Sequence, residues 1–255
     1  MVKIFRNIRK KLAAENKVSS YLRYAIGEIL LVVIGILIAL QVNNWNVQRK
    51  QRARELHYLS NLKNDLNLNI AEIKKYIVTR NSKIISANIV LEYFEGKPLT
   101  DLEEFNRNTV NVYTWQKFFQ IDNTFREMTN SGNLSIISND SIKNNLFNLE
   151  TLYKKLKYEE EHFRYDSEVM LYEPSYSILD INSIVKNFTY QVTNGQQGEH
   201  IQLSKEDYMA LLNNRKQKNG FAMATYEFPV MNSQLEEMKT LCERIISLID
   251  KELEN

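Results

Sequence analysis

The sequence has few of the residues that build loop-rich or cross-linked proteins. Its 255 residues include one cysteine, Cys242, together with three prolines and seven glycines. A single cysteine excludes an intrachain disulfide framework and a zinc cluster made of cysteines. The scarcity of Gly and Pro argues against an all-β chain, which would need many turns. With 44% hydrophobic residues the composition is that of an ordinary globular protein, and we expect a mainly helical one.

The common motifs of catalytic and cofactor sites are also missing. The sequence contains no H-E-x-x-H, G-x-S-x-G, P-loop or dinucleotide fingerprint. The histidines, His57, His162 and His200, share no ligand spacing. Glu159-x-x-His162 is half of a di-iron pattern that needs a second copy, so we interpret it as a solvated acidic face. We therefore expect no catalytic residue, no cofactor and no metal, and the protein is not expected to be an enzyme.

Charge is distributed unevenly along the chain. Residues 1–54 hold eleven of the 33 basic residues but only two of the 31 acidic ones, Glu15 and Glu28. This segment therefore carries a net charge of +9 and the remainder −7. A basic beginning and an acidic remainder indicate two environments. The acidic charge of the larger part also argues against nucleic-acid binding.

Residues 24–42, YAIGEILLVVIGILIALQV, form a continuous apolar run in which Glu28 is the only charged residue. At 1.5 Å per residue, these nineteen residues span about 28 Å, close to the hydrocarbon thickness of a bilayer. Tyr21 precedes the run and Trp45 follows it, where interfacial aromatic residues are common. The pattern predicts a transmembrane helix with the lipid bilayer as its first partner.

Positive charge predicts the orientation of this helix. Seven Lys and Arg residues precede it, whereas the next four, between Arg49 and Arg54, follow a neutral gap. This bias places the N-terminus in the cytoplasm and residues 43–255 outside it. A cleaved signal peptide is the alternative, but the run is long and no A-x-A-like site follows. Residues 1–23 are then a basic cytoplasmic segment, either a short amphipathic helix on anionic lipid or a disordered tail.

Glu28 is a candidate functional residue, because acids inside a membrane are costly. It lies only one helical turn past Tyr24, where it can reach the interface or Arg23, and this interfacial role is the simpler interpretation. Gly35 and Ala39 form one small-xxx-small pair, a weak indication that two such helices approach closely.

Two stretches carry a resemblance to a known family. Residues 15–46, ENKVSSYLRYAIGEILLVVIGILIALQVNNWN, resemble the opening of a family of uncharacterised single-pass proteins from flavobacteria and related Bacteroidetes. Residues 124–146, TFREMTNSGNLSIISNDSIKNNL, resemble a helix–SGNL–helix motif of the same family, which is a domain of unknown function. The resemblance implies a bacterial inner-membrane protein with a periplasmic helical domain. It brings no activity, cofactor or catalytic residue.

Apolar residues recur every seven positions between Trp45 and Gly96, which predicts one long helix with a narrow buried seam. A similar seam near the C-terminus makes an antiparallel pair the economical arrangement. Cys242 then belongs to the core, with a reactive thiol as the sharper alternative. The first seam consists of Leu56, Lys63, Ile70, Ile77, Ile84, Leu91 and Leu59, Leu66, Ile73, Arg80, Ala87, Phe94; the second, of Met231, Leu235, Met238, Cys242, Ile245 and Ile249.

Shorter elements are predicted between the two long helices. We expect one helix opened by the capping box Thr100-x-x-Glu103, and others over 115–130, from Asn139 or Asp140 to about Leu171, and from Ser204 to about Lys216. Ile184–Val192 is predicted as a short strand. The fold class is therefore mainly α: a transmembrane helix followed by an extracytoplasmic helical bundle with long heptad-patterned helices, in one domain.

The turn Ser131-Gly132-Asn133 is the candidate loop of the outer part. One interpretation makes it a ligand or partner loop. The preferred interpretation makes Gly132 a left-handed cap, with Leu134, Ile136 and Ile137 packed into the core.

Three hypotheses follow for function. The first is a membrane-anchored interaction or scaffold module that binds a protein partner or a second copy through its heptad seams. The second is a periplasmic ligand-sensing domain that signals through a separate membrane partner. The third is an enzyme with an unrecognised site, which has the least support because function must be argued from a site.

Overall fold

A computed structural model describes residues 18–254 of the chain, and every regular element within that range is a helix. The mainly α fold class is therefore confirmed. The predicted strand at Ile184–Val192 is wrong, because α7 (Ile181–Val192) is a helix capped by the Asp180 side chain, which accepts from the Ser183 N–H. The chain forms two compact units, one ending at His57 and the other beginning at Tyr58, and each is described by itself.

The first unit contains the apolar run. It lies in α2 (Val18–Phe94), and an 18-residue window of this helix has a mean hydropathy of 2.6 with 0% of it buried. The helix is thus long and apolar enough to cross a membrane. Glu28 lies in this stretch and is partly exposed. The amphipathic helix considered for the basic beginning of the chain falls on residues 1–17, outside the described residues.

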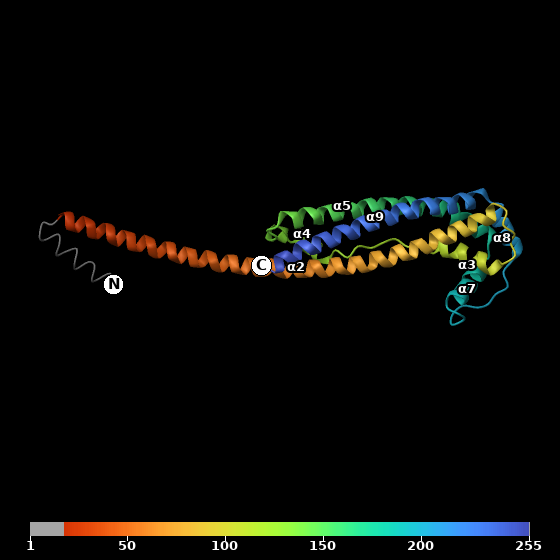
Figure 1. The fold of residues 1–255 in the computed structure, drawn as a ribbon, viewed down its shortest axis with the longest axis horizontal. Coiled ribbons are helices and arrows are strands. Elements are labelled where there is room, and N and C mark those ends of the chain that lie inside the picture. The colour runs from red at the N-terminus through yellow and green to blue at the C-terminus, as the bar shows by residue number, and fades with distance from the viewer. Residues whose placement is uncertain (1–17, 255) are drawn as a thin grey trace. The chain divides into compact units, whose positions relative to one another are not determined.

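The second unit is built on three long helices that lie side by side (Figure 1): α2 from Tyr58 onward, α5 (Asp140–Ser167) and α9 (Arg215–Leu253). The predicted antiparallel pairing of α2 and α9 is confirmed by contacts along both helices. These are Lys63 Nζ to Asp250 Oδ1 at 2.5 Å, Asn81 to Asn232 at 2.9 Å, and the rings of Phe94 and Phe221 at 6.1 Å between centroids.

The predicted seams form the core of this bundle. Leu59, Leu66 and Ile73 of α2 are buried, and all six seam residues of α9, Cys242 among them, are buried as well. Burial also raises the pKa of the Cys242 thiol to about 12, so this cysteine is an inert core residue at neutral pH. The seam surfaces are therefore covered by helices of the same chain.

Shorter helices complete the unit, several of them gathered at the end of the bundle where α2 finishes (Figure 1). The cap of α3 is Asp101, whose side chain accepts from the Glu104 N–H, and not the predicted Thr100. Ser204 caps α8 as predicted. The elements are α3 (Leu102–Tyr113), α4 (Asn123–Asn130), a 3-10 turn (Asn133–Ile136), a π-helical turn (Glu168–Tyr172), α6 (Glu173–Ile178), α7 and α8 (Lys205–Leu212).

Residues 115–122 are extended, so the helix predicted over 115–130 is wrong in its first half and only α4 forms. We call residues 115–122 the strap. In a helix the backbone N–H and C=O groups bond to each other, whereas backbone groups of the strap bond to side chains of α2 and α5. Asn69 accepts from the Ile121 N–H at 2.8 Å and donates to the Ile121 carbonyl at 2.6 Å. The Phe118 N–H donates to Glu160 at 2.8 Å, and the Phe118 ring is fully buried.

Candidate functional site

The residues proposed from the sequence lie in different places. Glu28 is in the first unit, and the Ser131–Asn133 turn is in the second. Gly132 has φ of 71°, the left-handed conformation expected of a cap, and Ile137 beyond it is fully buried. The Asn133 amide donates to the Tyr58 hydroxyl at 3.1 Å. These contacts fix the turn against α2 and are what a structural cap requires.

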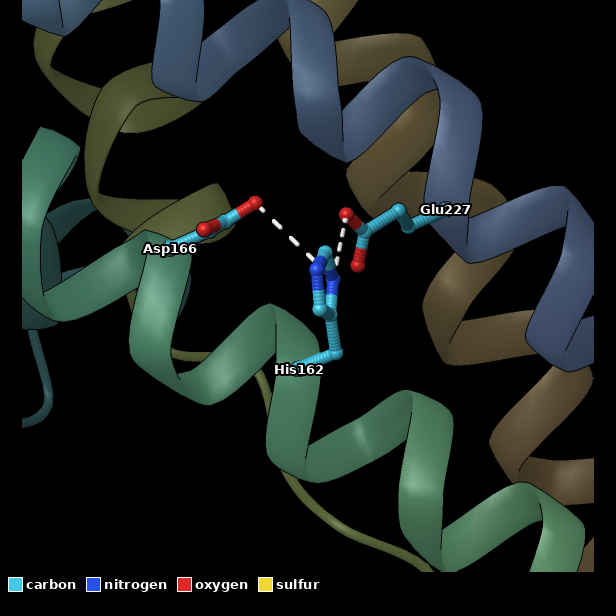
Figure 2. Close-up of side chains that lie close together, drawn as sticks. All are labelled: His162, Asp166 and Glu227. Atoms are coloured by element: carbon cyan, nitrogen blue, oxygen red, sulfur yellow. Dashed lines mark hydrogen bonds and ion pairs between the residues drawn. The ribbon is translucent and has the colours of Figure 1, made fainter.

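The structure also brings together three residues that the sequence did not group. His162 and Asp166 lie four residues apart on α5, so they share one helix face. Glu227 projects from α9 toward them (Figure 2). The His162 Nδ1 atom lies 3.2 Å from Glu227 Oε1 and 3.9 Å from Asp166 Oδ2. One ligand atom from each residue lies within 4.8 Å of the others, so this trio is able to hold a metal ion.

Glu227 is the most buried member of the trio. The residue is only 5% exposed, and its Oε2 atom makes no hydrogen bond to any described residue. Its pKa is raised, first by desolvation, while the His162 charge lowers it and the charges of Asp166 and Glu159 raise it. The His162 side chain is 53% exposed, so the trio opens to solvent at the histidine.

One pair within this trio carries a signal in the sequence. Its four-residue spacing on one helix was a usable signal for His162 and Asp166. Glu227 lies 65 residues from His162, and no spacing rule connects them. The interpretation of the Glu159–His162 stretch as a solvated acidic face is wrong for Glu160, which is fully buried beside Arg80, while His162 is half exposed and contacts the buried Glu227 carboxylate.

A second group of charges lies beneath the strap. Arg80 and Glu160 form a fully buried ion pair, and Lys157 Nζ lies 3.0 Å from Glu160 Oε2. Desolvation lowers the pKa of Arg80, and the nearby Glu160 carboxylate raises it. Desolvation likewise lowers the pKa of Lys83 to about 8, although its Nζ donates to the Asn111 carbonyl at 2.7 Å. These groups contact backbone carbonyls and each other, so their geometry is that of a structural network.

Two grooves lie on the second unit. The first, between α2, α3 and α7, has a volume of about 580 Å³. We call it the α2–α7 groove; its lining includes Val78, Ile85, Arg107, Phe188 and Val192. The second, between α5 and α9, has a volume of about 510 Å³. We call it the α5–α9 groove; its lining includes Asn145, Asn148, Lys155, Glu237 and Arg244.

Over residues 18–254, these features define a helical protein with one candidate membrane span and a three-helix core. The chain belongs to a family of unknown function, DUF6090, whose model matches residues 28–193. The resemblance found in the sequence, to a family catalogued as a domain of unknown function, is thereby confirmed. The match runs from Glu28 to the end of α7 and stops before α8 and α9. No curated protein and no solved structure matches the chain.

Proposed function

We propose that the protein is a non-enzymatic interaction module, anchored in the bacterial inner membrane by residues 24–42 and holding its helical domain in the periplasm. The anchor is supported by the apolar run, whose window is exposed within the described residues. The orientation is supported by the seven Lys and Arg residues that precede the run, against the four between Arg49 and Arg54 that follow it.

The observation that carries the interaction role is the exposed apolar side of α2. Val78 is 70% exposed and Ile85 is 61% exposed, and they lie seven residues apart on one face. Across the α2–α7 groove lie Phe188 and Val192 of α7. Two apolar walls separated by a groove of this size are typical of surfaces that receive an amphipathic helix.

The occupant we propose is a helix of a partner protein with an apolar stripe and a carboxylate. Among the described residues that line the α2–α7 groove, Arg107 is the one with a charge, and the rest of its polar lining is amide and hydroxyl. Arg107 contacts the neutral Gln191 at 3.5 Å, so an acidic group on the partner gives the better match. We place the partner in this groove rather than on the predicted heptad seams, because the α9 seam is buried within the chain and the α2 seam is buried or partly buried.

The test uses the full-length protein in its native membrane with a photo-crosslinking residue in place of Val78 or Ile85. The control position is Tyr226 on α9, which is 69% exposed and lies outside the α2–α7 groove. We expect one discrete crosslinked species at 78 and 85 and none at 226. We also expect Val78→Glu, but not Tyr226→Glu, to abolish that species.

The mass of the crosslinked species distinguishes the occupants. A product of twice the mass of the chain identifies a second copy and rejects a separate partner. Crosslinks that are equal at 78 and 226, or that survive Val78→Glu, overturn the docking site.

The α5–α9 groove favours a second candidate, a ligand-sensing domain. Lys155 and Arg244 bring two cations to a groove also lined by Asn145 and Asn148, a set of donors suited to a small anionic ligand. Thermal melting of the full chain across a panel of small carboxylates and phosphates tests it. A stabilisation that Arg244→Gln removes supports this candidate, and flat melting curves across the panel reject it.

A further inference from the structure

We propose that His162, Asp166 and Glu227 form a binding site for a divalent transition-metal ion such as Zn²⁺, held between α5 and α9. This inference concerns a side of the domain that the proposed docking does not use, and it does not rest on the proposed function.

The ligand atoms have nearly the spacing that such an ion requires. Zinc binds histidine nitrogen and carboxylate oxygen at 2.0–2.2 Å, which places tetrahedral ligands about 3.4 Å apart. The His162 Nδ1 atom already lies 3.2 Å from Glu227 and 3.9 Å from Asp166. All three ligand atoms lie within 4.8 Å of one another, so binding needs them to draw together by about 1 Å.

The buried carboxylate of Glu227 is the second, independent observation. This residue is only 5% exposed, faces His162 in Figure 2, and has an Oε2 atom without a hydrogen bond to any described residue. A buried carboxylate oxygen without a donor is costly. The carboxylates of Asp166 and the nearby Glu159 place further negative charge close to Glu227. A dication would supply the missing partner and offset this negative charge.

The donor set selects the class of metal. One imidazole nitrogen with two carboxylates suits zinc and its neighbours, whereas Mg²⁺ and Ca²⁺ prefer oxygen ligands alone. Three protein ligands leave a fourth position for water, and the half-exposed His162 opens that position to solvent. Protons compete with the metal for all three ligands, so binding should weaken as the pH is lowered.

A plain histidine–carboxylate contact is the competing explanation, and the chain contains a natural control for it. His200 Nε2 lies 2.8 Å from Glu103 Oε1, closer than the corresponding distance at His162. Within the described residues, however, no third ligand group joins His200, and the trio of His162 is the one group of three. A contact of two residues should not retain zinc, whereas the trio should.

The experiment is calorimetric titration of Zn²⁺ into the full-length, tag-free protein in detergent at pH 7.5, after removal of metal with a chelator. We expect one zinc per chain. His162→Gln and Glu227→Gln should each weaken binding by more than the roughly 10–100-fold typical of residues outside the ligand shell. His200→Gln should leave the affinity unchanged, and Mg²⁺ should give no binding. With Co²⁺, the unsubstituted protein and H200Q should show the visible absorption of a four-coordinate site, and H162Q and E227Q should not.

The variants distinguish loss of a zinc ligand from loss of the fold. Glu227→Gln keeps the size of the side chain and removes a buried charge, so it should retain helical circular dichroism and its melting temperature. Should it nevertheless unfold, Asp166→Asn, at a more exposed position, gives the same expected loss of zinc. Zinc binding of equal strength in the unsubstituted protein and in H162Q, equal loss in H162Q and H200Q, or no zinc binding at all, overturns the proposal.

Discussion

Two stretches of α2 are both rich in apolar residues, 14 of 18 in residues 25–42 and 18 of 36 in residues 59–94, and they differ in how those residues are arranged. In residues 25–42 the apolar side chains surround the helix, and they are exposed. In residues 59–94 most of them follow one stripe that is buried against other helices of the chain, while Leu68, Val78 and Ile85 lie exposed outside it. A helix with one apolar stripe can bury that stripe against other helices of the same chain. A helix that is apolar on all sides needs an apolar environment outside the chain, such as a lipid bilayer.

The polar residues differ between the two stretches as well. The first has one charged residue, Glu28. The second carries Asn69, Tyr76 and Arg80, which reach across to the strap and hydrogen-bond its backbone. The second stretch of α2 is therefore both a core helix and the support of an extended segment.

The largest expected effect comes from placing the same acid in each stretch. Ile73 is fully buried in the seam, and Ile73→Asp should prevent stable folding of the helical domain because it buries an unpaired charge. Ile34→Asp should leave domain melting unchanged and weaken membrane insertion by about 3 kcal/mol. Circular dichroism and membrane fractionation measure the two outcomes. A folding defect in I34D, or normal folding in I73D, would break the comparison.

Arg80→Met should give the next largest effect. It leaves the fully buried Glu160 with less compensating charge, and we expect a loss of about 3 kcal/mol in the free energy of unfolding, measured with urea. The double variant Arg80→Met with Glu160→Gln should recover at least half of this loss, because Gln still accepts from the Phe118 N–H without carrying a charge. No recovery in the double variant would show that the packing of Arg80, rather than the charge balance, stabilises the strap.

Asn69→Ala tests how much the hydrogen bonds between α2 and the strap contribute to stability, without changing the charge of the protein. The substitution removes both hydrogen bonds to the backbone of Ile121, and we expect a loss of about 2 kcal/mol in the free energy of unfolding. Asn88→Ala is the matched control, because its exposed amide donates within α2, to the Ile84 carbonyl. Equal losses in the two variants would contradict a specific role of the strap contacts.

The smallest expected change in stability comes from substituting one of two helical glycines, Gly220 and Gly35. A Cβ on Gly220 of α9 would lie 2.4 Å from Leu171 Cδ2, whereas a Cβ on Gly35 would meet nothing within 4 Å. Gly220→Ala should therefore cost about 1–2 kcal/mol by overpacking, because Leu171 is fully buried and its Cγ would also lie only 2.7 Å from the added Cβ. Gly35→Ala should leave the melting temperature of the domain unchanged. A stabilised G220A would show that the helix propensity of alanine exceeds the steric cost.

Sequence periodicity predicted the parts of the fold in which one face of a helix is buried. The seams of α2 and α9, and the caps Asn139 and Ser204, depend on neighbours within a few residues and were predicted correctly. The strap was missed because Phe118 and Ile121 are spaced as on a helix, while the groups that hold it come from Asn69 and Glu160. Contacts between such distant positions leave no local pattern.

The same reason limited prediction of the trio at His162. The sequence places His162 and Asp166 on one face, but it cannot show that Glu227 arrives there from an antiparallel helix. Conversely, the turn at Ser131, Gly132 and Asn133 is easy to find in the sequence, because Gly is a strong local signal. Local signals of this kind identify turns, whereas a binding site is built from residues far apart in the chain.

The strap also provides a reporter of how the domain comes apart. Backbone amides in helices exchange with solvent when their own helix opens. The amides of Phe118 and Ile121 are instead bound by side chains of two different helices, Glu160 on α5 and Asn69 on α2. Exchange at Phe118 therefore reports release of the strap from α5, and exchange at Ile121 reports its release from α2, even while both helices remain intact.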